Sequence, residues 1–167
     1  MDILPYMIVV YLAFLLFLRP PKAVVIASLL GGLTMGVINA LVDLLAYYAH
    51  WWHYTFKGLI LHLPLPFYAT PILIYGGIVY LLIWRFWHGR GRWFALLLLI
   101  AIPILGFVRD LGLALAGSGY FAWDSSLAAL FDLLLWPLMF YAGFLVFKRL
   151  SVGHVCEIAK LDSKQAS

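Results

Sequence analysis

Five apolar runs, separated by short polar segments, dominate the chain. They cover approximately residues 3–18, 23–48, 67–87, 93–116 and 126–147. A helix needs about 20 apolar residues to cross the hydrocarbon layer of a bilayer, and four of the runs reach that length, while the first is short but can be extended. The pattern therefore predicts an all-α bundle of five transmembrane helices within one domain, residues 1–150, followed by a polar cytoplasmic tail, residues 151–167.

Composition supports a lipid environment. Hydrophobic residues make up 66% of the chain and charged residues 11%, whereas soluble domains have roughly half apolar and about a quarter charged residues. A chain this short exposes much of its surface, so the apolar surplus must face the lipid bilayer. The net charge of +4 would suit nucleic acid, but the cations lie at the ends of the apolar runs, as in membrane proteins. We expect no nucleic-acid partner.

The positions of the basic residues predict an orientation. Nine lie on one side of the five-span arrangement, Lys57 lies on the other side, and Arg109 lies inside a run. The nine are Arg19, Lys22, Arg85, Arg90, Arg92, Lys148, Arg149, Lys160 and Lys164. Because cytoplasmic loops carry the excess of Lys and Arg, we expect a multi-pass cell-membrane protein with its amino terminus outside and its carboxyl terminus in the cytoplasm. The first run has no basic residue before it, which is the wrong order for a secretory signal.

The third and fifth runs share a motif. Residues 71–77 and 137–143 both read Pro, three apolar residues, Tyr and two small residues, which places Tyr75 and Tyr141 at matching positions. The small residues, which would permit close helix contact, are Gly76, Gly77, Ala142 and Gly143.

The spacing of two aspartates extends this similarity. Asp43 precedes Pro71 by 28 residues (43 to 71), and Asp110 precedes Pro137 by 27 (110 to 137). We therefore predict two parallel-repeat helical hairpins, the second with the third run and the fourth with the fifth, preceded by a single helix. Parallel repeats are one way to build a pocket between two halves of a membrane protein.

Four ionisable residues fall inside the predicted spans, namely Asp43, Arg109, Asp110 and Asp132. Such residues are costly in lipid and mark candidate functional sites. Counted at about 1.5 Å per residue, all four lie roughly 7–10 Å below the outer surface, with Asn39 one turn deeper. One guanidinium cannot satisfy three carboxylates, so at least one aspartate should be protonated or face water. The layer is either a structural polar knot or a site for proton transfer or for the polar end of a substrate.

The geometry of a helix suggests how this layer is paired. Arg109 and its neighbour Asp110 project about 100° apart. We therefore expect Arg109 to reach across a helix interface to Asp43 or Asp132.

The two predicted outer loops are aromatic, residues 50–54 and 120–124. Trp and Tyr prefer the headgroup level, so an interfacial belt is the favoured interpretation. His50 and His53 could share a metal, but two histidines without a clear third ligand favour the interfacial alternative. Gly-rich phosphate loops, zinc-protease motifs, catalytic serine triads and haem ligation are not evident. We expect no cofactor and no metal, and the single Cys156 excludes a disulfide framework.

Residues 42–83 contain Asp43, then the turn Trp52-His53-Tyr54, then a Leu-Pro-Leu-Pro-Phe segment at 63–67, and a fainter second copy runs from Asp110 to Trp123. In this order of residues the segment resembles the repeat of the lycopene-cyclase-domain membrane proteins. An uncharacterised family of small bacterial five-span proteins is similar over most of the chain. The glutamate pair of the cyclases is absent, because the only glutamate is Glu157 in the tail.

The resemblance implies a hydrophobic isoprenoid, carotenoid-like or lipid ligand between the hairpins, and a divergent carotenoid-type enzyme as one form of that function. Acid–base chemistry would then fall to other carboxylates, with Asp43, Asp110 and Asp132 as the catalytic candidates. The ligand-binding candidates are Asn39, Arg109, Trp52, Tyr54, Tyr75, Trp123 and Tyr141. Two alternatives stay open: a non-enzymatic subunit or scaffold that docks another membrane protein in a homo- or hetero-oligomer, and a small transporter that oligomerises.

Overall fold

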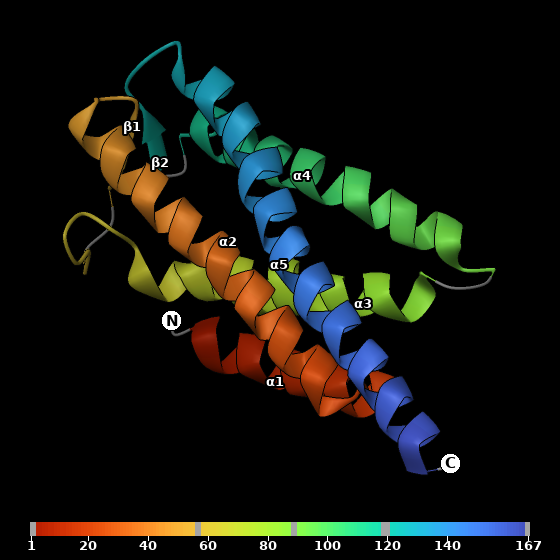
Figure 1. Cartoon of the computed structure of the whole chain (residues 1–167). Helices are drawn as coiled ribbons and strands as arrows, with labels where there is room; N and C mark the ends of the chain where they lie inside the picture. Colours follow the sequence, from red (N-terminus) through yellow and green to blue (C-terminus); the bar gives the residue numbers. More distant parts are fainter. Residues whose placement is uncertain (1–2, 56–57, 88–89, 118–120, 166–167) are drawn as a thin grey trace.

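The chain forms an elongated bundle of helices with a two-stranded ribbon at one end (Figure 1). The computed structural model describes residues 3–55, 58–87, 90–117 and 121–165, the side chains of 3 and 152–165 excepted. In chain order the elements are α1 (Ile3–Leu18), α2 (Lys22–Tyr48), β1 (Trp52–Tyr54), the 3-10 helix η1 (Leu65–Tyr68), the π-helix η2 (Thr70–Ile78), α3 (Val79–Phe86), α4 (Arg92–Leu115), β2 (Phe121–Trp123) and α5 (Ala128–Gln165).

Within these described ranges, four helical segments are long and apolar enough to cross a membrane. They are α2, the continuous segment Leu65–Phe86, α4 and Ala128–Ser151 of α5. The sequence-based prediction of an all-helical, multi-pass membrane protein is confirmed at that level. Helix α1 has 16 residues and is therefore about 24 Å long, which is shorter than a typical span. Many apolar side chains of α4, for example Ile100 and Leu105, are exposed on the surface of the bundle, as expected of a face that contacts lipid.

Glycines set the close packing around α2, which lies against both η2 and α5. Gly32 contacts the backbone of Ile72 and of Gly76 in η2, and Gly31 contacts Gly143 in α5. A side chain at any of these glycines would collide with backbone atoms of the neighbouring helix, so the crossings depend on their small size. Gly76 and Gly143 were expected to lie at contacts, whereas the sequence had not singled out the pair on α2.

The third span differs from the uniform helix predicted over 67–87. It begins with the 3-10 turn η1, continues as the π-helix η2, and becomes α-helical only at Val79. Pro71 removes one N–H from the helical ladder, and the Gly76-Gly77 pair lowers the cost of an unusual backbone. Short π-helical turns are frequently found at functional sites, and η2 contributes to the cavity described below.

Helix α5 also differs from its predicted bounds. It begins at Ala128 and continues to Gln165, beyond the predicted end at 147, so the segment expected as a polar tail is helical through that residue. Residues 151–165 contain no proline, and the backbone hydrogen bonds of a helix do not depend on apolar side chains. Loss of hydrophobicity therefore indicated where the apolar span ends, and not where the helix ends.

The two aromatic segments predicted as loops form a ribbon. Strand β1 pairs antiparallel with β2, with Trp52 opposite Trp123 and Tyr54 opposite Phe121. The amide of Asp124 donates to the Trp51 carbonyl at 2.9 Å and extends the pairing. Aromatic residues are favoured in strands because they pack across neighbouring chains. The predicted loop residue Tyr120 lies outside the described residues.

Candidate functional site

A cavity of about 390 Å³ lies next to the ribbon, among residues of α1, α2, η1, η2, α4 and α5. Its walls come from all the helical spans and from both strands. Five of the predicted site residues line it, namely Asn39, Tyr54, Tyr75, Arg109 and Asp110. Most of the remaining wall is apolar or aromatic, and the apolar side chains of Phe67 and Leu113 are both exposed and part of the lining.

Arg109 and Asp110 form an ion pair at the cavity wall. The guanidinium approaches Asp110 Oδ1 at 2.8 Å through Nε and at 2.7 Å through a terminal nitrogen. Its Cζ lies 5.2 Å from the ring centre of Trp136 and 5.8 Å from that of Tyr75. Both are cation–π distances, so the guanidinium is held between its carboxylate and two aromatic faces.

This pairing corrects the prediction that Arg109 reaches Asp43 or Asp132 on another helix. The 100° separation of neighbouring residues applies where their side chains leave the helix. An arginine side chain is long and flexible enough to turn back to the carboxylate beside it. The faces of Trp136 and Tyr75 then stabilise the guanidinium in that position.

Trp136 fixes Asp110 from the facing helix. The indole Nε1 donates to Asp110 Oδ2 at 2.8 Å. The ring lies directly against Gly106, one turn before Asp110 on α4, in the space that a Cβ there would occupy. Because Gly106 has no side chain, Trp136 can approach α4 closely enough to donate its hydrogen bond to Asp110. The sequence did not identify either residue, although Trp136 immediately precedes the Pro137 of the repeat motif.

Asp43 lies behind the cavity wall and accepts three hydrogen bonds. Trp52 Nε1 donates to Oδ1 at 2.9 Å, and the hydroxyls of Tyr54 and Tyr68 donate to Oδ2 at 3.0 and 2.7 Å. The carboxylate is 4% exposed and has no ion-pair partner among the described residues. These three donors stabilise the negative charge of the carboxylate in place of an ion-pair partner. Tyr68 was missed in the sequence, and it follows directly on the proline-rich segment at 63–67.

Tyr54 and Tyr68 link Asp43 to the cavity, because their side chains belong to its wall. Burial, together with the nearby Asp43, holds the pKa of Tyr54 well above its usual value. The phenol of Tyr54 therefore keeps its proton and remains a donor to Asp43.

Three other predicted site residues lie away from the cavity lining. Asp132 is buried, and its Oδ2 has no hydrogen-bond partner in the part of the chain that the structure describes. The indole Nε1 of Trp123 is likewise buried without an acceptor there. Tyr141 is 42% exposed, and its hydroxyl donates to the Leu99 carbonyl of α4 at 3.0 Å. The four ionisable residues of the predicted layer therefore occupy three places. Arg109 and Asp110 pair at the cavity wall, Asp43 lies behind that wall, and Asp132 is buried away from the cavity.

At the ribbon, His53 Nδ1 lies 2.7 Å from Asp124 Oδ2, and both side chains are partly exposed. Exposed pairs of this kind contribute about 0–1 kcal/mol, so its role is to complete the contact between the loops. Across the described residues, no group of three or more His, Cys, Asp or Glu side chains could hold a metal ion.

The site combines three kinds of polar group within an aromatic enclosure: a guanidinium on its carboxylate, phenols that donate to a buried carboxylate, and the amide of Asn39. Comparisons of the chain with protein-family models, curated proteins and solved structures found no match. What the site does must therefore be inferred from its own geometry.

Proposed function

We propose that the protein binds the end group of an isoprenoid-like or lipid molecule in the cavity between its two hairpins. The observation that carries this proposal is the cavity itself. Its volume of about 390 Å³ falls within the range of about 300–1,000 Å³ that small-molecule sites occupy. Its charged side chains are Arg109 and Asp110, while aromatic and aliphatic side chains form most of the wall, a combination suited to an apolar ligand with one polar end.

The exposed lining residues indicate how such a ligand enters. Phe67 and Leu113 line the cavity and are 43% and 36% exposed. Exposed apolar side chains in a membrane-spanning region face hydrocarbon, so we infer that the cavity opens toward lipid near these two residues. A long chain would extend through this opening into the bilayer, and only its end group would occupy the enclosed volume.

The residues that carry the lycopene-cyclase resemblance support the same proposal. Asp43, Trp52 and Tyr54 are joined by hydrogen bonds, and Tyr54 belongs to the cavity wall. If the ligand undergoes acid–base chemistry here, Asp110 contacts the cavity directly and Asp43 acts through Tyr68. Asp132 does not reach the lining, which leaves it a packing role in this proposal.

We propose further that the bundle has five spans arranged as α1 and two repeated hairpins, with the amino terminus outside. The nine-to-one division of basic residues supports this topology. The ribbon supports the repeat, because an antiparallel pair of equivalent loops is the arrangement that a two-fold axis generates. Trp52 and Tyr54 of β1 would then correspond to Phe121 and Trp123 of β2.

Cysteine labelling in intact cells tests the topology. In a Cys156→Ser background, a cysteine at Ser125 should react with a membrane-impermeant maleimide, and a cysteine at Arg90 should react only after the cells are opened. The most direct loop positions, Gly119 and Gly89, lie outside the described residues. Labelling of the Arg90 position alone from outside would overturn the orientation.

Blocking the cavity tests the ligand proposal. Leu113→Trp should fill the opening and lower the binding of all-trans-retinol, a fluorescent isoprenoid alcohol, by about tenfold or more, because a filled pocket loses its apolar contacts. Energy transfer from tryptophan to retinol in detergent solution measures the affinity. Leu105→Trp is the matched control, since this residue lies on the same helix, is exposed and does not line the cavity.

Extraction of the purified protein provides a second readout. A coloured or lipid molecule that co-purifies with the wild type and is lost in the Leu113→Trp variant would support the site. Equal retinol binding by both tryptophan variants would reject it. A stable complex with other membrane subunits, together with an empty cavity, would favour the scaffold alternative.

A further inference from the structure

A second cavity lies at the opposite end of the bundle, between α3 and α5. Its volume is about 160 Å³, and its walls include Trp84, Trp87, Phe144 and Phe147, with Lys148 at its edge. This space is smaller than the usual small-molecule pocket of about 300 Å³ or more. Its aromatic lining suits a short length of acyl chain.

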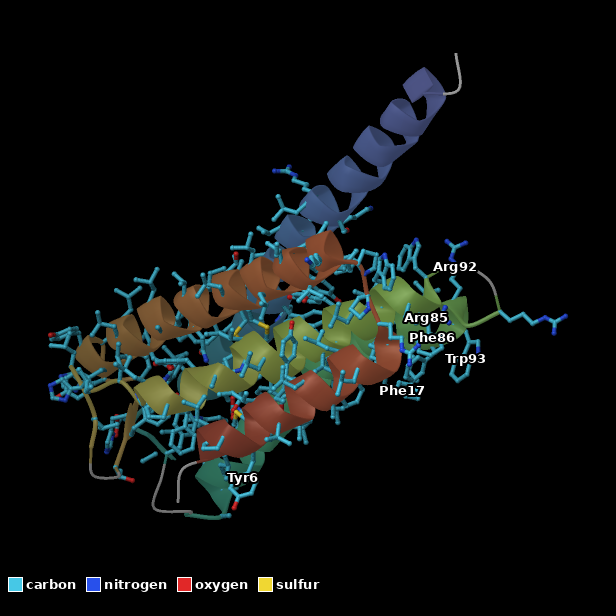
Figure 2. The ribbon with its side chains drawn as sticks, turned by 90° about the horizontal axis from the view of Figure 1, so that it is seen from below. Tyr6, Phe17, Arg85, Phe86, Arg92 and Trp93 are labelled. Carbon is cyan, nitrogen blue, oxygen red and sulfur yellow. The ribbon has the colours of Figure 1, made fainter. Side chains whose placement is uncertain are left out.

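Two cations lie next to this cavity, which we call the α3–α5 groove. Besides Lys148, Arg92 lies beside it, with its Cζ 5.9 Å from the ring centre of Trp87. Arg85 and Arg92 gather with Phe86, Trp93 and Phe17 at this end of the molecule (Figure 2). Seven exposed cations lie at this end of the molecule and have no ion-pair partner among the described residues: Arg19, Lys22, Arg85, Arg90, Arg92, Lys148 and Arg149.

The acidic side chains that the structure describes lie away from these cations and do not neutralise their charge. Asp43, Asp110 and Asp132 are bound or buried toward the ribbon, and Asp124 contacts His53 there. A lysine at the edge of an apolar groove can bury its stem along the aromatic wall and hold its ammonium group at the headgroup level. The groove therefore combines an apolar surface for an acyl chain with positive charge beside it.

We infer that this groove binds an anionic phospholipid, with part of an acyl chain between α3 and α5 and the phosphate between Lys148 and Arg92. Basic pockets between membrane helices select lipids with anionic headgroups by this combination of contacts. The inference is independent of the ligand proposed for the larger cavity.

Native mass spectrometry of the detergent-purified full chain tests this site with two probes of identical acyl chains, phosphatidylglycerol and phosphatidylcholine. The wild type should retain phosphatidylglycerol preferentially. Lys148→Gln should weaken phosphatidylglycerol binding by about five-fold, the effect of one cation near the headgroups. Arg149→Gln removes the same charge from the next residue of α5, which does not line the groove, and should leave the preference unchanged.

Circular dichroism should show the same helical content for both variants, because both side chains are exposed. Equal retention of the two lipids by the wild type would overturn the inference, as would equal losses in the two variants, which would indicate attraction by total charge. Displacement of the lipid by soluble glycerol 3-phosphate would show that the site binds phosphate without contacting the acyl chain. That result would also overturn the inference.

Discussion

Gly106→Ala should lower the free energy of unfolding by about 1–3 kcal/mol, the range observed when a packed core is overfilled. The new methyl group would occupy the position of the Trp136 ring. Trp136 would have to move away from α4, and its hydrogen bond to Asp110 would lengthen or break. Reversible unfolding in mixed detergent, followed by circular dichroism, measures the loss, and a shift in tryptophan emission reports the displaced indole.

Gly112→Ala is the matched control on the same helix. Nothing lies within 4 Å of a Cβ at that position. Alanine also has the higher helix propensity, so this variant should be as stable as the wild type or slightly more stable. Equal destabilisation of the two variants would show that the contact between Trp136 and Gly106 does not determine the effect.

Asp43→Leu should destabilise the protein by about 3 kcal/mol or more. The change removes the acceptor of three hydrogen bonds, from Trp52, Tyr54 and Tyr68. A buried donor without its partner costs about 1–3 kcal/mol, and hydrocarbon supplies no replacement acceptor. Asp43→Asn keeps one acceptor oxygen and should lose less stability than Asp43→Leu. The same unfolding assay measures both.

Asp124→Asn is the comparison for a carboxylate at the surface. It is partly exposed and contacts a single histidine, so its replacement should change stability by less than about 1 kcal/mol. If Asp43→Asn abolishes ligand binding or turnover while stability is kept, Asp43 has a chemical role beyond packing. If Asp43→Leu is as stable as the wild type, the three hydrogen bonds do not hold this region together.

The helical segments and the polar residues within them could be predicted because both follow from the cost of placing polar groups in lipid. Asp43 and Asp110 were selected by that argument, and both have indole donors. Five of the ten predicted site residues line the larger cavity. Three of them, Asn39, Arg109 and Asp110, are polar residues within spans, and such side chains tend to face the protein interior. Tyr54 and Tyr75 were instead candidates from the resemblance and the repeat motif.

The partners of these groups could not be predicted, since they depend on side-chain conformation and on helix separation. Arg109 turns back to Asp110 because Trp136 and Tyr75 supply aromatic faces at the correct distance. That distance is set by Gly106, whose importance no local pattern reveals. The π-helix η2, which contains Pro71, and the continuation of α5 to Gln165 involve backbone hydrogen bonds, and these leave little trace in a pattern of apolar positions.

The pairing of β1 with β2 has a mechanical consequence. It fastens the loop after α2 to the loop after α4, with further contacts between His53 and Asp124 and a 3.8 Å stack of Trp51 on Phe131. The ribbon is therefore a clamp that joins the end of α2 to the end of α4, in addition to the glycine contact between α2 and α5. A transporter that alternately opens to both sides of a membrane would have to unfasten this clamp in every cycle. A protein that admits its ligand sideways from the bilayer can leave it closed.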